Sequence, residues 1–350
     1  MKRKFSLALG GIVLAVVIIA LVVLTTLLIT APKDDFVPDD NSDIKLVVLG
    51  DSIAEAVLGP SPISEREDYS YCSLLGQING FTYHNRAVSG YETKHLLEYI
   101  SREKDDSAYA HITKIKEADV IVISILGNDF LLNGFNENII SAMNDDYTRA
   151  DAILANSYVN IDGIVKRIRT LNPDVELIIQ TVYNPMFPES LIMEPWALET
   201  LLNDYNVKKE DLHHIASKLI NRLNNVLFEY LKNNPDSFRI ADVNAKFDAI
   251  YKARPERLDR FIYEDYIHPS NEGHAIIMST VQSVLEDLGL CDPYNALVNY
   301  KNVKIAQLHR LYDNTEVKVS EVESKIKSAY TIDEVTEAYF DGVYGVDPIY

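Results

Sequence analysis

Four short polar motifs in this chain carry the residue types that a serine nucleophile needs to hydrolyse an ester. In chain order they are Gly50-Asp51-Ser52, Ser89-Gly90, Gly127-Asn128-Asp129 and Asp265-Tyr266-Ile267-His268. Serine is a weak nucleophile, so it requires an adjacent base, a carboxylate that orients this base, and hydrogen-bond donors for the oxyanion. A serine, a histidine that follows an aspartate, a glycine and an asparagine supply these parts.

Taken singly, each motif also has a purely structural explanation. Gly-Asp-Ser and Gly-Asn-Asp are common turn sequences, and Gly90 suits a turn with a positive φ angle. Asp265 could cap the following helix, and His268 could be a solvated residue before Pro269. The catalytic interpretation therefore depends on whether the elements around the motifs bring them together.

Strands and helices alternate along the part of the chain that holds the motifs. Residues 44–49 and 119–126 are continuous apolar and β-branched runs, which is typical of strands buried on both faces. Further strands are predicted at 82–85, 175–182 and 239–243, and helices at about 69–78, 93–102, 147–171, 209–232 and 270–288. This order predicts a three-layer α/β/α sandwich around a five-stranded parallel sheet with right-handed crossovers.

The predicted sheet places the four motifs at one edge. Ser52, Gly90 and Asn128 follow the first, second and third strands, and His268 stands before the last helix of the sandwich. In open α/β sheets, ligands bind at the carboxyl ends of the strands. We therefore expect these residues to lie close together.

Two connections at the same edge, 128–147 and 183–208, are too long to be simple turns. They carry apolar side chains that include Phe130, Phe187 and Trp196. One interpretation is an apolar wall that binds substrate, and the other is that these side chains pack onto the core.

The four motifs together resemble the SGNH hydrolases, also called GDSL lipases/esterases, a family named for a Ser, a Gly, an Asn and a His in four separated blocks. The resemblance covers about 44–288, with Ile53 where the family has leucine. Segments 171–173 and 183–185 look like those of membrane-anchored or secreted members from Gram-positive bacteria. The family implies a flavodoxin-like sheet with strand order 2-1-3-4-5.

The resemblance also implies a role for each motif residue. Ser52 is expected to be the nucleophile, His268 its general base, and Asp265 the carboxylate that orients the imidazole. The backbone N–H groups of Ser52 and Gly90 and the side-chain amide of Asn128 are expected to form the oxyanion hole. Neither a metal nor an organic cofactor is required.

Asp51 and Asp129 flank these residues in the motifs. We expect both carboxylates to brace loops and not to react.

Composition and charge exclude some other functions. Hydrophobic residues make up 47% of the chain and charged residues 24%, as in globular proteins. The net charge of −19 argues against binding to nucleic acid, which requires a basic surface.

The two cysteines, Cys72 and Cys291, could form a disulfide or stay unpaired, and no Cys/His cluster predicts a metal site. The adjacent His213 and His214 are interpreted as surface or capping residues.

The N-terminal residues predict a membrane anchor. Lys2, Arg3 and Lys4 precede an apolar run over 5–31, which is long enough to cross a bilayer. The basic flank favours the cytoplasmic side, so the remainder of the chain is predicted to lie outside the cytoplasm, after a linker at 32–43. The alternative is a signal peptide that is cleaved, giving a secreted protein.

The predicted hydrolase domain spans 44–293 and is followed by a helical C-terminal extension, 294–350. Thr331 and Glu334 form a capping box for a helix at about 332–340. The extension has no catalytic pattern, and we expect it to pack against the hydrolase domain.

The sequence thus predicts an extracytoplasmic, membrane-anchored serine esterase. Its substrate is an ester of an acyl lipid or an O-acetylated glycan. Two other functions remain open: an O-acyltransferase with the same triad, and a non-catalytic surface binding module with the same fold. The oligomeric state is not predicted.

Overall fold

The computed structural model describes residues 43–57, 66–105, 110–312 and 317–346. These residues belong to one compact unit, Pro38–Tyr350. The predicted anchor at 1–31 lies outside the described residues, and within these no helix combines the length and apolar character needed to cross a membrane. Cys72 and Cys291 are both described and are not joined by a disulfide.

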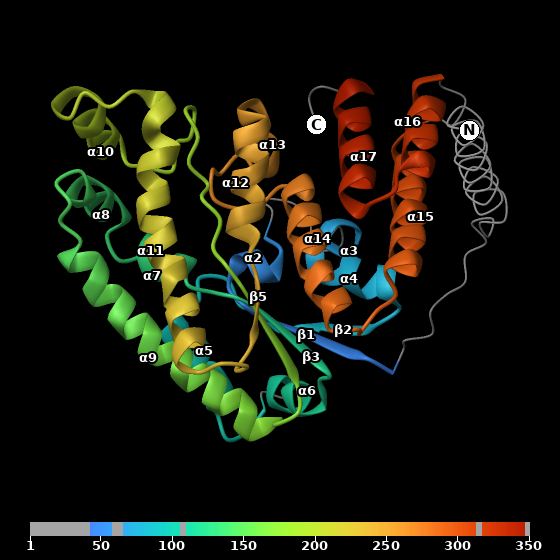
Figure 1. Cartoon of the computed structure of the whole chain (residues 1–350), viewed down its shortest axis with the longest axis horizontal. Coiled ribbons are helices and arrows are strands. Elements are labelled where there is room, and N and C mark those ends of the chain that lie inside the picture. Colours follow the sequence, from blue (N-terminus) through green and yellow to red (C-terminus); the bar gives the residue numbers. More distant parts are fainter. Residues whose placement is uncertain (1–42, 58–65, 106–109, 313–316, 347–350) are drawn as a thin grey trace, which may run out of the picture. The chain divides into compact units, whose positions relative to one another are not determined.

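A five-stranded parallel sheet forms the centre of this unit (Figure 1). Its strands are β1 (Lys45–Gly50), β2 (Thr82–Asn85), β3 (Val120–Ser124), β4 (Glu176–Gln180) and β5 (Arg239–Ala241). Their spatial order is β2-β1-β3-β4-β5, and every pair of neighbours is parallel. The predicted sheet and strand order are confirmed.

Successive side chains along a strand point to opposite faces of the sheet, and each face packs against its own set of helices. Leu46 and Val48 of β1 belong to one core cluster, and Val47 and Leu49 belong to another. The first cluster includes residues of α4 (Tyr71–Asn79), α12 (Val243–Ala253) and α14 (Asn271–Asp287). The second includes residues of α5 (Thr93–Ile100), α6 (His111–Glu117), α9 (Thr148–Leu171) and α11 (Leu212–Asn233).

The two connections predicted as long loops contain helices instead. They form α7 (Gly127–Leu131), α8 (Phe135–Ala142), α10 (Pro195–Glu199) and a π-helical turn (Thr200–Asp204). The residue before α8, Gly134, has φ +85° and makes no side-chain cap. The usual polar start signal of a helix is therefore missing from the sequence at this point.

Three helices form the C-terminal extension: α15 (Pro293–Leu311), α16 (Val317–Ser328) and α17 (Ile332–Val346). α15 packs against α4, α17 packs against α14, and α16 contacts α15 and α17 (Figure 1). Asn299 donates a hydrogen bond of 2.8 Å to the carbonyl of Ile78 in α4. One bond of the predicted capping box is present, since the N–H of Glu334 donates to Thr331 Oγ1 at 3.1 Å, whereas the Glu334 carboxylate accepts from the N–H of Tyr330 at 2.6 Å.

Gly50 occupies a position where β1 ends against β3. Its φ is +133°, and a Cβ atom added there would lie 1.8 Å from the carbonyl oxygen of Ser124. We expect Gly50→Ala to separate the strand ends and to lower the free energy of unfolding by about 3 kcal/mol or more, measured by urea denaturation. Gly289→Ala is the matched control, because Gly289 has φ +69° but no atom within 4 Å of the added Cβ. That control should cost about 1 kcal/mol, and equal costs for the two variants would contradict the argument.

Candidate active site

Ser52 begins the short helix α2 (Ser52–Glu55) directly after the central strand β1. The N–H of Asp51 donates to the carbonyl of Ser124 in β3 at 3.0 Å. The carboxylate of Asp51 accepts a hydrogen bond from the N–H of Ile53 at 3.0 Å and so caps α2. These two contacts hold Ser52 at the carboxyl edge of the sheet, where it was predicted.

Asp265 and His268 contact each other in the segment between α13 (Leu258–Phe261) and α14. His268 Nδ1 lies 2.5 Å from Asp265 Oδ2. Because a carboxylate accepts, Nδ1 carries the proton, and Nε2 is left as the basic nitrogen. Nε2 is buried and has no hydrogen-bond partner among the described residues. The pair therefore has the arrangement of a base and its orienting carboxylate.

Asp265 is stabilised as an anion. Its Oδ1 accepts hydrogen bonds of 3.0 Å from the N–H groups of Ile267 and His268. Burial by itself raises the pKa of Asp265, but the hydrogen bonds from the His268 ring and from the two N–H groups outweigh it, and the pKa lies below its ordinary value. The carboxylate consequently stays charged at neutral pH.

The segment that carries this pair is fixed at several points. Tyr183, which follows β4, donates its hydroxyl to the carbonyl of Ile267 at 2.5 Å. The N–H of Tyr263 donates to the carbonyl of His268 at 2.7 Å, and Ile262 and Pro269 form an antiparallel bridge. These bonds restrict the position of the imidazole.

Gly90 lies in the loop after β2, with φ +79° and an exposed surface. Glu55 of α2 accepts hydrogen bonds from the N–H of Ser89 at 2.7 Å and from its hydroxyl at 2.5 Å. Asn85 donates to the carbonyl of Ala54 at 2.7 Å. The Gly90 loop is thus tied to the helix that begins with Ser52. Glu55 belongs to no sequence motif, because its partner Ser89 lies 34 residues away in the sequence.

Asn128 lies in α7 and donates one amide hydrogen to the carbonyl of Tyr91 at 3.0 Å. A side-chain amide has two N–H donors, so the second is available for an oxyanion. The neighbouring Asp129 accepts hydrogen bonds from the N–H of Thr93 (3.0 Å), the Thr93 hydroxyl (2.6 Å) and the Ser157 hydroxyl (2.8 Å). Asp129 thus joins α7 to Thr93 and Ser157, whereas Asp51 caps α2.

Ser52 and Asn128 line a common cavity of about 60 Å³, together with Ile267, the residue before His268. The other walls are mostly apolar side chains: Phe130, Leu131, Phe135, Val182, Ile192, Ile220 and Leu223. The sequence-based interpretation named Phe130 for this wall. It missed the side chains from α11, Ile220 and Leu223, because only the folded chain shows that this helix faces Ser52.

The other two aromatic residues proposed for substrate binding do not line this cavity. Phe187 is buried in the core, with its ring centroid 5.9 Å from that of Tyr266. Trp196, in α10, is 49% exposed.

His213 is buried, and its interpretation as a surface or capping residue is wrong. Its Nδ1 lies 2.6 Å from the carbonyl oxygen of Met186, and its Nε2 lies 3.1 Å from Asp248 Oδ1. Adjacent residues on a helix face different directions, so His213 points inward while His214 is exposed. Its carbonyl also accepts a hydrogen bond from Asn184 at 2.8 Å, which fixes the start of the connection after β4.

Asp51 is buried directly beside Ser52. Burial raises its pKa from 3.8 to about 7, although the N–H groups of Ile53 and Ala54 and the nearby His268 oppose this shift. The carboxyl group is therefore partly protonated at neutral pH.

Residues 48–276 match the model of the GDSL-like Lipase/Acylhydrolase family. The chain is 26% identical over 255 residues to the uncharacterized protein YpmR of Bacillus subtilis (strain 168), a match that covers 71% of this chain and 83% of the relative.

Among solved structures, the chain is similar to the lipase Lip_vut3 from a goat rumen metagenome, with 20% identity, a TM-score of 0.47 and coverage of 69% of this chain and 96% of the other. It is also similar to an extracellular lipase from Streptomyces rimosus, with 17% identity, a TM-score of 0.45 and coverage of 69% and 99%.

The burial of Asp51 predicts a pH-dependent stability difference in Asp51→Asn, which keeps an N-cap on α2 and removes the ionisable group. The folded state raises the pKa of Asp51 from 3.8 to about 7. The contribution of Asp51 to the free energy of unfolding is therefore fully present below about pH 4 and is lost as the pH rises through 7. We expect no gain in the free energy of unfolding of the variant at pH 4 and a gain of up to about 4 kcal/mol at pH 8.

Urea denaturation at both pH values measures this difference. Asp242→Asn is the matched control, since Asp242 is a half-buried N-cap of α12. A gain for Asp51→Asn that is equal at pH 4 and pH 8 would contradict the assignment.

Proposed function

Because this chain belongs to the GDSL-like lipase/acylhydrolase family and is an ester-hydrolysing enzyme, we propose that it acts through an acyl-enzyme on Ser52. The observation that carries this proposal is the 2.5 Å hydrogen bond between His268 Nδ1 and Asp265, which leaves Nε2 as a base. The position of Ser52 and Asn128 in one cavity supports the same mechanism.

In the first half of the reaction, His268 Nε2 takes the proton of Ser52 as Oγ attacks the ester carbonyl carbon. The carbonyl oxygen becomes an oxyanion and accepts hydrogen bonds from the N–H groups of Ser52 and Gly90 and from the Asn128 amide. The bond from carbon to the alcohol oxygen then breaks, and His268 gives its proton to the departing alcohol. Asp265 stabilises the imidazolium throughout.

In the second half, water attacks the acyl group on Ser52, and His268 takes a proton from this water. The second tetrahedral intermediate collapses, His268 returns the proton to Ser52 Oγ, and a carboxylic acid leaves. One ester and one water give one alcohol and one acid.

The size of the cavity favours a short acyl group. A volume of about 60 Å³ has room for only a few water molecules, which suits an acetyl group better than a long chain. The apolar walls from Phe130, Leu131 and Ile192 suit the methyl group. We therefore propose O-acetyl esters, such as those of glycans, in preference to acyl lipids.

The proposed location is the outer face of the cell membrane. It is supported by the three basic residues at 2–4, the apolar run at 5–31 and the linker at 32–43. The catalytic unit would then meet its substrate outside the cytoplasm.

Removal of single groups tests the mechanism. Ser52→Ala should abolish hydrolysis of p-nitrophenyl acetate, and Asn128→Ala should lower kcat by about 10²–10³ with a smaller change in KM, because the lost donor acts in the transition state. Leu132→Ala, an exposed position beside α7, is the control and should keep full activity. Residual Ser52→Ala turnover close to wild type would remove Ser52 from the mechanism.

The acyl preference can be tested with p-nitrophenyl esters from acetate to octanoate. We expect kcat/KM to be highest for acetate, and Phe130→Ala to move the optimum to longer chains because it enlarges the cavity. Trp196→Ala should leave the preference unchanged, since Trp196 lies outside the cavity. A wild-type optimum at octanoate would refute the short-acyl proposal, and the absence of Ser52-dependent hydrolysis on every ester would favour acyl transfer.

A further inference from the structure

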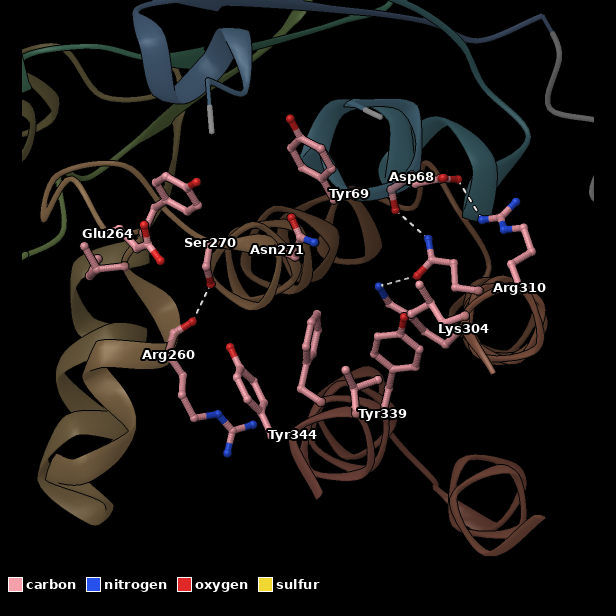
Figure 2. Close-up of a pocket in the computed structure, with 16 residues that line it drawn as sticks. Asp68, Tyr69, Arg260, Glu264, Ser270, Asn271, Lys304, Arg310, Tyr339 and Tyr344 are labelled. Atoms are coloured by element: carbon pink, nitrogen blue, oxygen red, sulfur yellow. Dashed lines mark hydrogen bonds and ion pairs between the residues drawn. The ribbon is translucent and has the colours of Figure 1, made fainter. Parts of the chain in front are cut away.

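A second and larger cavity, of about 670 Å³, lies between the C-terminal helices α15 and α17 and the start of α14 (Figure 2). Small-molecule sites typically have volumes of about 300–1,000 Å³. None of its lining residues lines the cavity at Ser52. Figure 2 shows Ser270 and Asn271 on one side, Tyr339 and Tyr344 opposite them, and Lys304 beside Tyr339.

Lys304 is a buried lysine on the wall of this cavity, with 2% exposure. Its Nζ donates to Gln307 Oε1 at 3.0 Å and lies 4.8 Å from the ring centroid of Tyr339 and 5.1 Å from that of Phe340. An ammonium has three N–H donors, so capacity remains for a ligand.

The two carboxylates that act on the pKa of Lys304 form ion pairs with arginine side chains. Asp68 pairs with Arg310 at 2.8 Å, and Glu272 pairs with Arg257 and with Arg260. Burial lowers the pKa of Lys304 to about 7, against the opposing effect of these two carboxylates. A buried ammonium without a dedicated counterion is costly, and an anionic group inside the cavity would stabilise it.

Two further buried atoms on residues that line the cavity lack a hydrogen-bond partner among the described residues: Arg260 Nη2 and Asn271 Oδ1. Buried polar atoms in folded proteins are almost always hydrogen-bonded. A ligand in the cavity would supply an acceptor for Arg260 Nη2 and a donor for Asn271 Oδ1; the carboxylates of Asp68 and Glu264 also line the cavity.

Aromatic rings form much of the remaining wall, with Tyr69, Tyr263, Tyr339, Phe340 and Tyr344 among the lining residues. The guanidinium of Arg260 lies over the Tyr344 ring at 4.2 Å. Ring faces pack well against the C–H faces of a sugar, and the polar groups between them suit hydroxyls better than an acyl chain.

We propose that this cavity binds a carboxylated sugar, with its carboxylate at Lys304, a hydroxyl at Asn271 and its ring against Tyr339 or Tyr344. The site is separate from Ser52 and does not depend on the esterase mechanism. It adjoins the segment that carries Asp265 and His268. Two of its lining residues, Tyr263 and Ser270, lie on either side of that pair in the sequence.

Isothermal titration of the full-length Ser52→Ala chain with D-glucuronate, D-glucose and acetate tests the proposal without turnover. We expect D-glucuronate to bind and the other two to bind more weakly. Lys304→Met keeps the length of the side chain without its charge, and it should weaken D-glucuronate binding by roughly 10- to 100-fold, the loss of one hydrogen bond to a charged group. Lys301→Met, in the same helix, is the control and should bind like the parent chain.

Asn271→Asp provides a second variant that preserves shape and suits the first turn of α14. Its carboxylate should repel D-glucuronate and leave D-glucose binding nearly unchanged. The proposal is overturned if D-glucuronate does not bind the Ser52→Ala chain, if D-glucose binds equally well, or if D-glucuronate binding survives in both Lys304→Met and Asn271→Asp.

Discussion

The close contact between the ends of β1 and β3 determines where every other part of the site must lie. Gly50 has no Cβ, so the carbonyl of Ser124 can approach its Cα, and the next N–H, that of Asp51, bonds to the same carbonyl at 3.0 Å. The chain then turns directly into α2. Ser52 is therefore positioned by the centre of the sheet, and the capping carboxylate of Asp51 is buried as a consequence.

The other components are attached to this point by hydrogen bonds from different elements. Glu55 ties the Gly90 loop to α2, and Asn128 binds the same loop through Tyr91. Tyr183 binds the segment between α13 and α14 through Ile267. Electrostatic stabilisation of an oxyanion depends on donors that are in place before the reaction begins. These bonds, which join residues far apart in the sequence, provide that preorganisation.

Much of this could be predicted from the sequence, and the reasons for the remainder are physical. The strands were predictable because buried parallel strands require continuous apolar residues, as in β1 and β3. Ser52, Gly90, Asn128, Asp265 and His268 stand in recognisable motifs. By contrast, α8 begins after Gly134 without a capping side chain, and the inward direction of His213 depends on the rotation of α11. Burial also has no local signal, so neither the raised pKa of Asp51 nor the buried ammonium of Lys304 could be inferred from the motifs.

The central claim is that Ser52 carries the acyl group during turnover. Acid-quenching the enzyme during hydrolysis of p-nitrophenyl acetate, followed by peptide mass spectrometry, would locate the acyl group directly. The account predicts one acetyl group on the peptide that contains Ser52, and none on the corresponding peptide of Ser52→Ala. Acetylation of another residue at the same rate in both proteins, with no acetyl group on Ser52, would contradict it.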